Sequence, residues 1–127
     1  MNIQNLIQGA LKTVQKTIGS EVVYQRGSLS VELCAGLGSS PFETVDENGV
    51  MASWRSRDFL FDAAELELNG QQIEPQRGDL IRLPAGDKVE VYRVQHPDPK
   101  QHPWRYCDPT NTAIRVHTAR VDVVPAS

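Results

Sequence analysis

The chain has 127 residues, of which 39% are hydrophobic and 23% are charged. This size and composition suit one folded domain and exclude two independent cores or a disordered tail. The formal net charge of −3 excludes a strong cationic field that would hold DNA or an anionic membrane at long range. No apolar run approaches the ~20 residues that cross a bilayer, and we expect no signal peptide at the N-terminus.

The first segment predicts the one helix of the chain, over residues 1–19. Its apolar side chains recur at the i, i+3, i+4 and i+7 spacing of a single helical stripe; they are Ile3, Leu6, Ile7, Ala10, Leu11, Val14 and Ile18. Gly19 follows the stripe, where a left-handed cap residue is expected. A helix this short is marginal in water. We therefore expect the stripe to dock either on the chain's own β region or on a neighbouring subunit.

After Gly19 the pattern changes to that of β-strands. Residues 21–26 and 29–34 predict two strands with a turn at Gly27 between them. The glycines, serines and proline of residues 36–41 are predicted to end the second strand. Beyond them, residues 42–45 and 50–54 flank Asp46-Glu47-Asn48-Gly49, whose Asn-Gly pair favours a hairpin.

Segment 36–50 is the candidate functional segment of the sequence. Long segments rich in Gly, Ser, Pro and acidic residues are often functional. We interpret this one either as a plain hairpin excursion or as a loop that binds a partner and orders on assembly. The candidate partner or assembly residues are Gly38, Ser39, Ser40, Pro41, Phe42, Asp46, Glu47 and Asn48.

The second half of the chain predicts further short strands. They lie at residues 57–61, 80–83, 88–95 and 113–124. The last of them changes apolar parity between Val116 and Val121, which predicts a bulge or two strand segments. Residues 96–103 are too rich in proline for a strand interior.

These elements predict a mainly β fold, a small β-barrel or sandwich with an N-terminal amphipathic α-helix. The expected organisation is a single domain, residues 1–127. It comprises the helix (1–19), a β-barrel (20–124) with the loop 36–50, and a short tail (125–127).

No group of residues predicts a catalytic, cofactor-binding or metal site, so we do not expect an enzyme. His96, Asp98 and His102 match no familiar zinc spacing and are interpreted as parts of a solvated loop. Cys107 and His117 lack an activating motif around the thiol.

Two further features of the sequence have ordinary explanations. Cys34 and Cys107 are far apart in the chain, and we expect two reduced thiols of an intracellular protein. Arg77-Gly78-Asp79 spells a cell-adhesion tripeptide, but a glycine before a strand is explained as a tight turn whose aspartate caps backbone amides.

Five short motifs, taken in this order, are similar to proteins of phage and prophage neck modules. They are Ser56–Phe61, Ile73–Asp79, Val89–Val94, Trp104–Tyr106 followed by Asp108-Pro109, and Ile114–Thr118. In layout, over roughly residues 1–120, the chain resembles the lambdoid phage head–tail joining family, also called head-completion or stopper proteins. There too an amphipathic N-terminal helix precedes a small β-barrel.

The resemblance implies a structural connector in the virion neck, present in the host cytoplasm during assembly. It implies a ring of identical subunits, six-fold, between the portal and adaptor proteins of the head and the tail terminator or tail proteins. The ring would close the DNA-filled head and dock the tail, and DNA would pass through it without specific binding. By position, the family's assembly loop corresponds to residues 38–50.

Two other functions stay open from the sequence. The first is a tail-terminator or tail-tube subunit, which would extend a sheet between subunits. The second is a small nucleic-acid-binding β-barrel, in which Trp54, Trp104 and Tyr106 would stack on bases, although the acidic balance argues against it.

Overall fold

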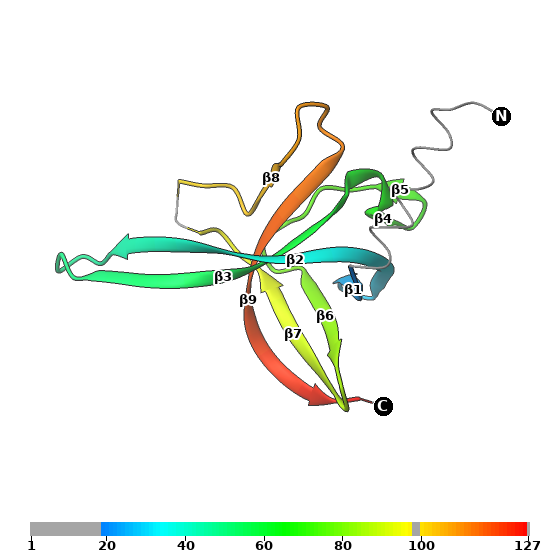
Figure 1. Ribbon diagram of the computed structural model, residues 1–127, viewed down its shortest axis with the longest axis horizontal. Helices are drawn as coiled ribbons and strands as arrows, with labels where there is room; N and C mark the ends of the chain where they lie inside the picture. The colour runs from blue at the N-terminus through cyan, green and yellow to red at the C-terminus, as the bar shows by residue number, and fades with distance from the viewer. Residues whose placement is uncertain (1–18, 98–99, 127) are drawn as a thin grey trace.

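The computed structural model describes residues 19–97 and 100–126, and most of these residues are in β-strands (Figure 1). The elements are β1 (Ser20–Arg26), β2 (Leu29–Val45), β3 (Met51–Asp62), the 3₁₀ turn η1 (Ala63–Glu65), β4 (Glu67–Leu68), β5 (Gln71–Gln72), β6 (Leu80–Ala85), β7 (Lys88–Val94), β8 (Trp104–Tyr106) and β9 (Ala113–Pro125). The prediction of a mainly β fold is confirmed. The helix predicted over residues 1–19 lies, except for Gly19, outside the described part of the chain, so it stays a prediction, as does the single domain.

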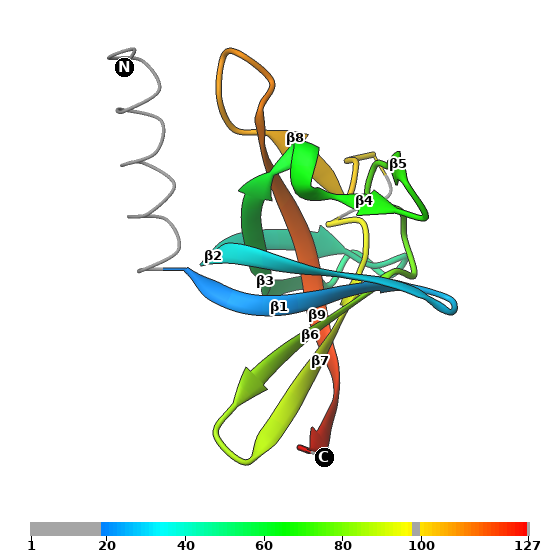
Figure 2. The ribbon, with the colours of Figure 1, turned by 90° about the vertical axis from the view of Figure 1, so that its right-hand side faces the viewer.

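The main sheet is antiparallel, with the strand order β3-β2-β1-β6-β7-β9-β8. Because β3 also pairs with β9, the strand pairings return to their starting point around the core. The ends of the strands nevertheless diverge. The β2–β3 hairpin, the β6–β7 hairpin and the loop between β8 and β9 point in different directions from the crossing of the strands (Figures 1 and 2). The sheet is therefore not a true barrel. The prediction is right about the β-strand content but not about a closed barrel.

The core lies inside the circuit of paired strands and is built by alternation along each strand. The fully buried large side chains include Tyr24, Phe59, Phe61, Leu66 and Ile81. Phe59 and Tyr92 meet edge to face with their ring centroids 5.4 Å apart. Each large apolar side chain contributes roughly 1.5–3 kcal/mol by leaving water.

The Arg77-Gly78-Asp79 tripeptide forms the tight turn expected from the sequence. The Asp79 carboxylate accepts hydrogen bonds from the Gln76 amide at 2.9 Å and from Arg26 at 2.9 and 2.8 Å. The Tyr24 hydroxyl donates to the same carboxylate. Burial, and next the hydrogen bond to Asp79, hold the pKa of Tyr24 well above its ordinary value, so the hydroxyl remains a donor. With an exposed fraction of 4%, Asp79 is not displayed for an adhesion receptor.

The predicted strand break at residues 36–41 is wrong. Strand β2 runs through these residues to Val45 and pairs with β3 from Gly36↔Leu60 onward. Its other neighbour, β1, ends its pairing at Ala35, so this half of β2 is an edge strand. Proline and glycine are tolerated at such edges because one side of the backbone has no ladder to interrupt.

A predicted bulge and a turn that was not predicted complete the strand connections. The predicted bulge in the last strand is confirmed, because Val91 pairs with Asp122 and Tyr92 with Arg120, which leaves Val121 as the extra residue. A second Asn-Gly pair closes the two-residue turn between β4 and β5. There Asn69 and Gly70 have φ values of 54° and 79°.

Candidate assembly surface

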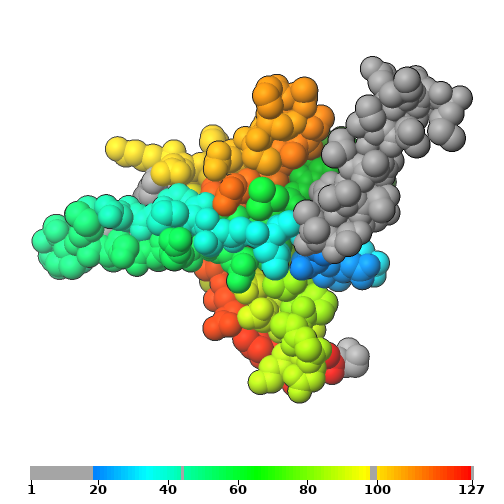
Figure 3. All heavy atoms as spheres, in the orientation of Figure 1, coloured from blue at the N-terminus to red at the C-terminus, as the bar shows by residue number. Residues whose placement is uncertain are grey.

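The longest projection of the molecule is a two-stranded arm, residues 36–60. It consists of the second half of β2, the turn 46–50 and most of β3, and it extends well beyond the rest of the described chain (Figures 1 and 3). Strand β1 pairs with β2 only as far as Ala35, and β9 pairs with β3 only from Arg57 onward. Within the described residues, 36–45 of β2 and 51–56 of β3 therefore each have one edge without a partner strand. Isolated two-stranded hairpins are marginally stable in water, so this arm needs an anchor.

The turn at the tip is held by Asp46. Its carboxylate accepts the backbone amides of Asn48 at 2.9 Å and of Val50 at 2.8 Å. Gly49 has φ 79°, a left-handed conformation that an L side chain rarely adopts. The hairpin predicted from the Asn48-Gly49 pair is confirmed, but segment 36–50 is a loop only over these few residues.

The anchor at the base of the arm is a buried carboxylate, Asp58, whose side chain is completely inaccessible. It accepts hydrogen bonds from Arg115 Nε at 2.6 Å, from His117 Nδ1 at 2.9 Å and from Ser40 Oγ at 2.5 Å. The hydroxyl of Ser56 also donates to it. One carboxylate thus joins β2, β3 and β9 where the arm leaves the body.

The Asp58 carboxylate remains ionised in this setting. Burial by itself would raise its pKa, but the hydrogen bonds from His117, Ser40, Ser56 and Arg115 together outweigh burial and hold the pKa well below its usual range. The network lies on the face of the sheet opposite the core, since Asp58 alternates with the core residue Phe59. This network of Asp58, Ser40, Ser56, Arg115 and His117, called the latch below, is therefore separate from the apolar core.

Aromatic rings pack beside this network. Phe42 packs against Trp54, with ring centroids 5.3 Å apart, and meets the His117 ring edge to face at 5.2 Å. Trp54 is the cross-strand partner of Phe42. Such a pairing adds about 0.5–1.5 kcal/mol beyond burial, and it continues the rigid part of the arm outward from Asp58.

Gly38 lies opposite Asp58 in the ladder and gives the arginine room. A Cβ atom at this position would come within 3.0 Å of Arg115 Nη2. Arg115 is fixed there because it also donates to the Ser39 carbonyl, at 3.3 Å. The glycine is therefore explained by the close approach of the guanidinium.

Replacing Gly38 by valine should weaken the latch. We expect the free energy of unfolding to fall by about 1–3 kcal/mol, because the new side chain displaces Arg115 from Asp58. Urea denaturation measures the change. The matched control is Gly36→Val, since a Cβ there meets only atoms 3.8 Å away; equal losses for both variants would contradict this explanation.

Apolar side chains gather toward the tip of the arm. Val45 and Met51, which face each other across the ladder, are each 64% exposed, and Val50 is 59% exposed. Leu37, nearer the base, is 42% exposed. Single exposed apolar residues are ordinary, but a group of them on a projection marks a contact surface.

The structure separates the candidate residues of segment 36–50 into two groups. Gly38 to Phe42 lie in the base of the arm, where Ser40 belongs to the latch and Phe42 packs beside it, whereas Asp46, Glu47 and Asn48 form the turn at the end. Sequence reasoning did not link Asp58 to Arg115 or to His117, because 57–59 residues separate these partners along the chain. The available signal was an aspartate directly before the apolar residues Phe59, Leu60 and Phe61 of a predicted strand.

The structure places the other described titratable candidates in separate surroundings. His117 is buried against Asp58, while Cys107 is exposed and its thiol contacts the Ala113 carbonyl at 3.5 Å. His96 Nδ1 lies 2.7 Å from the carbonyl of Gln101 in its own loop, and Asp98 is outside the described residues. Among the residues that are described, no three or more His, Cys, Asp or Glu side chains come close enough to hold a metal ion.

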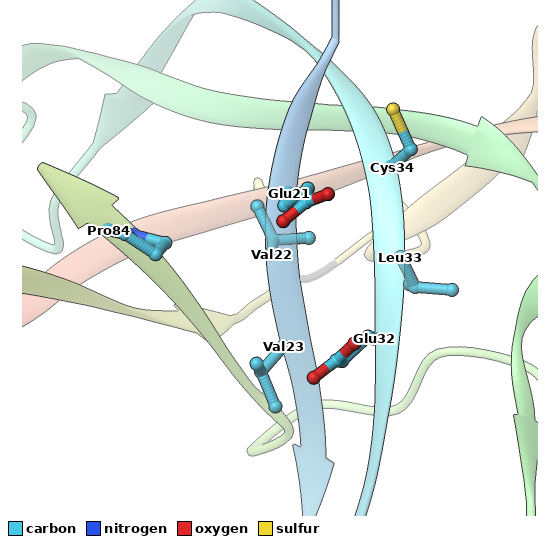
Figure 4. A pocket seen from close by; sticks show the side chains of 7 residues that line it. All are labelled: Glu21, Val22, Val23, Glu32, Leu33, Cys34 and Pro84. Carbon is cyan, nitrogen blue, oxygen red and sulfur yellow. The ribbon is translucent and has the colours of Figure 1, made fainter. Parts of the chain in front are cut away.

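A hollow of about 380 Å³ lies over β1 and β2 (Figure 4). Its lining residues are Glu21, Val22, Val23, Glu32, Leu33, Cys34 and Pro84. Because it opens widely to solvent and is made of strand side chains, it is a depression in the sheet rather than an enclosed cavity. It contains none of the candidate residues of segment 36–50.

The chain was compared with protein families and with curated proteins. A family model described as phage head-tail joining protein matches residues 1–125. A search of the curated proteins gave no match. Nowhere in the part of the chain that the structure describes is there a helix long and apolar enough to cross a membrane.

Proposed function

Because this chain belongs to the phage head–tail joining protein family, a family of structural proteins, we propose that it is a connector subunit of the virion neck. In this proposal it closes the DNA-filled head and docks the tail. Its partners are copies of itself in a ring, six-fold by the resemblance, the portal or adaptor proteins of the head, and the tail terminator or tail proteins. The packaged DNA passes through without specific binding.

The observation that carries the proposal is the arm. A projection with exposed apolar residues at its tip and a buried ionic latch at its base presents a preorganised contact surface. Such a surface suits a protein that works by assembling. The nucleic-acid alternative is weaker, since Trp54 packs against Phe42 and Trp104 packs partly against the core. This arrangement leaves few exposed rings to stack on bases.

The tail-terminator or tail-tube alternative is favoured by one feature, the unpaired strand edges of the arm. Residues 36–45 and 51–56 offer edges that a neighbouring subunit can extend into a continuous sheet. Spontaneous growth of the purified protein into tubes would favour this alternative over the connector.

The test uses a phage or prophage whose copy of this gene is deleted, with the protein supplied in trans. The wild-type protein should restore infectious particles, and its absence should leave DNA-filled heads without tails in electron micrographs. The arm variant Val45→Ser with Met51→Ser should stay folded but bind its partner about a hundredfold more weakly, because two apolar side chains would no longer be buried. Its particle yield should fall accordingly.

The control for the arm variant is Leu29→Ser, an exposed apolar residue outside the arm, at 42% exposure. This variant should restore the full yield. Normal tailed particles in the complete absence of the gene product would sink the connector proposal. Full yield with the arm variant would show instead that the tip is not the contact surface.

A further inference from the structure

A basic notch lies where the arm leaves the body. Strand β3 pairs with β9 only between Arg57↔Thr118 and Asp62↔Ala113, and beyond this point the two strands separate, β3 into the arm and β9 toward the C-terminus (Figure 1). Between them is an open notch of about 450 Å³. Its lining residues are Ser39, Arg55, Ser56, Arg57, Tyr92, Ala119 and Arg120.

The notch is positively charged in a chain of net negative charge. Three arginines line it and no carboxylate does. Arg120 forms an exposed ion pair with Glu90 at 2.9 Å. Within residues 19–97 and 100–126, Arg55 and Arg57 form no ion pair. An arginine-lined notch of this kind attracts a carboxylate-bearing segment.

The tip of the arm has the opposite charge. Residues 42–54 contain Glu43, Asp46 and Glu47 and no lysine, arginine or histidine. Val45 and Met51 lie among these carboxylates and are largely exposed. The tip therefore combines negative charge with an apolar surface.

Val45, Glu47 and Met51 cannot reach the notch of their own chain, whereas Glu43 is a diagonal neighbour of Arg55 on the same face of the ladder. The arm is one continuous ladder, and four residue steps separate the pair Pro41↔Arg55 from the pair Val45↔Met51, about 13 Å at ~3.3 Å per residue. The two strands run side by side to the turn without folding back (Figure 1). Any tip that fills a notch must therefore come from another molecule.

We propose that the tip of the arm, residues 43–51, docks in the basic notch of a second copy of this chain. This inference rests on the proposed function and identifies the contact by which the copies join. Glu47 meets Arg55 and Arg57 of the next copy, and Val45 and Met51 become buried. The open edges of β3 and of β9 beyond Thr118 accept the incoming strand through backbone hydrogen bonds.

The ring of the proposed function requires this contact to be head to tail, since a reciprocal exchange of tips between two copies would stop at the dimer. Each docked copy still has one free tip or one free notch, so association continues until the rotation closes a ring. An arm-to-arm contact between identical surfaces would stop at the dimer instead.

Charge reversal tests the contact in the full-length protein. Sedimentation velocity at low salt should show wild-type association beyond the dimer. A tip variant (Glu43→Arg with Glu47→Arg) and a notch variant (Arg55→Glu with Arg57→Glu) should each associate at least about tenfold more weakly. A mixture of the two, and a chain carrying all four changes, should associate again. The matched control is Glu65→Arg with Glu67→Arg, an equal charge change at exposed residues outside the arm.

Several results would overturn the inference. They are the absence of wild-type association at the highest soluble concentration, association that stops at the dimer, and failure of the four-change chain to recover while circular dichroism shows it folded. Retention of a DNA duplex at low salt that the notch variant abolishes would assign the notch to phosphate instead.

Complementation of the gene-deleted phage separates this inference from the proposed function. Self-association without complementation counts against the connector alone. Complementation by the tip variant, despite its lost association, overturns the tip-to-notch contact alone.

Discussion

Replacing Asp58 by alanine is expected to lower the free energy of unfolding by about 3–5 kcal/mol, because it removes one partner of a buried ionic network. Arg115 and His117 would lose their carboxylate, and two serine hydroxyls would lose an acceptor. For a chain of this size the thermal midpoint should fall by roughly 10 °C or more. Urea and thermal denaturation measure both quantities.

The same variant should lose part of the acid sensitivity of the protein. The pKa of Asp58 is depressed in the folded state, so its contribution is present above the unfolded-state pKa of about 3.9 and is lost as the pH falls toward the folded-state pKa. The stability difference between wild type and Asp58→Ala should therefore shrink below about pH 4.

The matched control for the latch is Glu43→Gln, which removes an exposed carboxylate of the same arm. It should change stability by less than about 0.5 kcal/mol. A loss of less than about 1 kcal/mol for Asp58→Ala, or a pH-independent difference, would show that the network does not hold the arm.

Replacing Asp79 by alanine should cost about 3–4 kcal/mol of unfolding free energy, again by leaving buried partners unpaired. Arg26 would lose both of its carboxylate hydrogen bonds, and the Tyr24 hydroxyl and the Gln76 amide would lose their acceptor. Chemical denaturation at neutral pH measures the loss.

The control for this turn is Arg77→Ala, in the same tripeptide but exposed. It should leave stability within about 0.5 kcal/mol of wild type. A Tyr24→Phe variant should cost only about 1–1.5 kcal/mol, since one hydrogen bond is lost and the carboxylate keeps Arg26. If Arg77→Ala were as damaging as Asp79→Ala, the turn would depend on the whole tripeptide rather than on the buried carboxylate.

Local chemistry made much of the fold predictable. The Asn48-Gly49 pair, the turn at Gly27 and the parity change near Val121 each act over a few residues, and the structure contains the hairpin, the turn and the bulge at those places. Alternation likewise predicted the strand at Lys88–Val94. The family resemblance was readable for the same reason, since its motifs are short runs within single strands and turns, and the family match over residues 1–125 confirms it.

The arm was misread because local rules misjudge edge strands. Glycine, serine and proline in residues 36–41 usually end a strand. Here they continue it, because this half of β2 pairs on one side only and Gly38 must make room for a guanidinium from β9. No pattern in residues 36–50 refers to residue 115.

The sequence by itself determined that the chain is mainly β, where most of its turns lie, that its net charge is acidic and which family it resembles, because these properties are written in composition and in neighbours along the chain. Only the tertiary structure decided that Asp58 meets Arg115 and His117, that Asp79 meets Tyr24 and Arg26, and that a basic notch lies beside the arm with the acidic tip. The reason is that charge pairing depends on distance in space, and the closing of β3 onto β9 brings together side chains that lie nearly 60 residues apart.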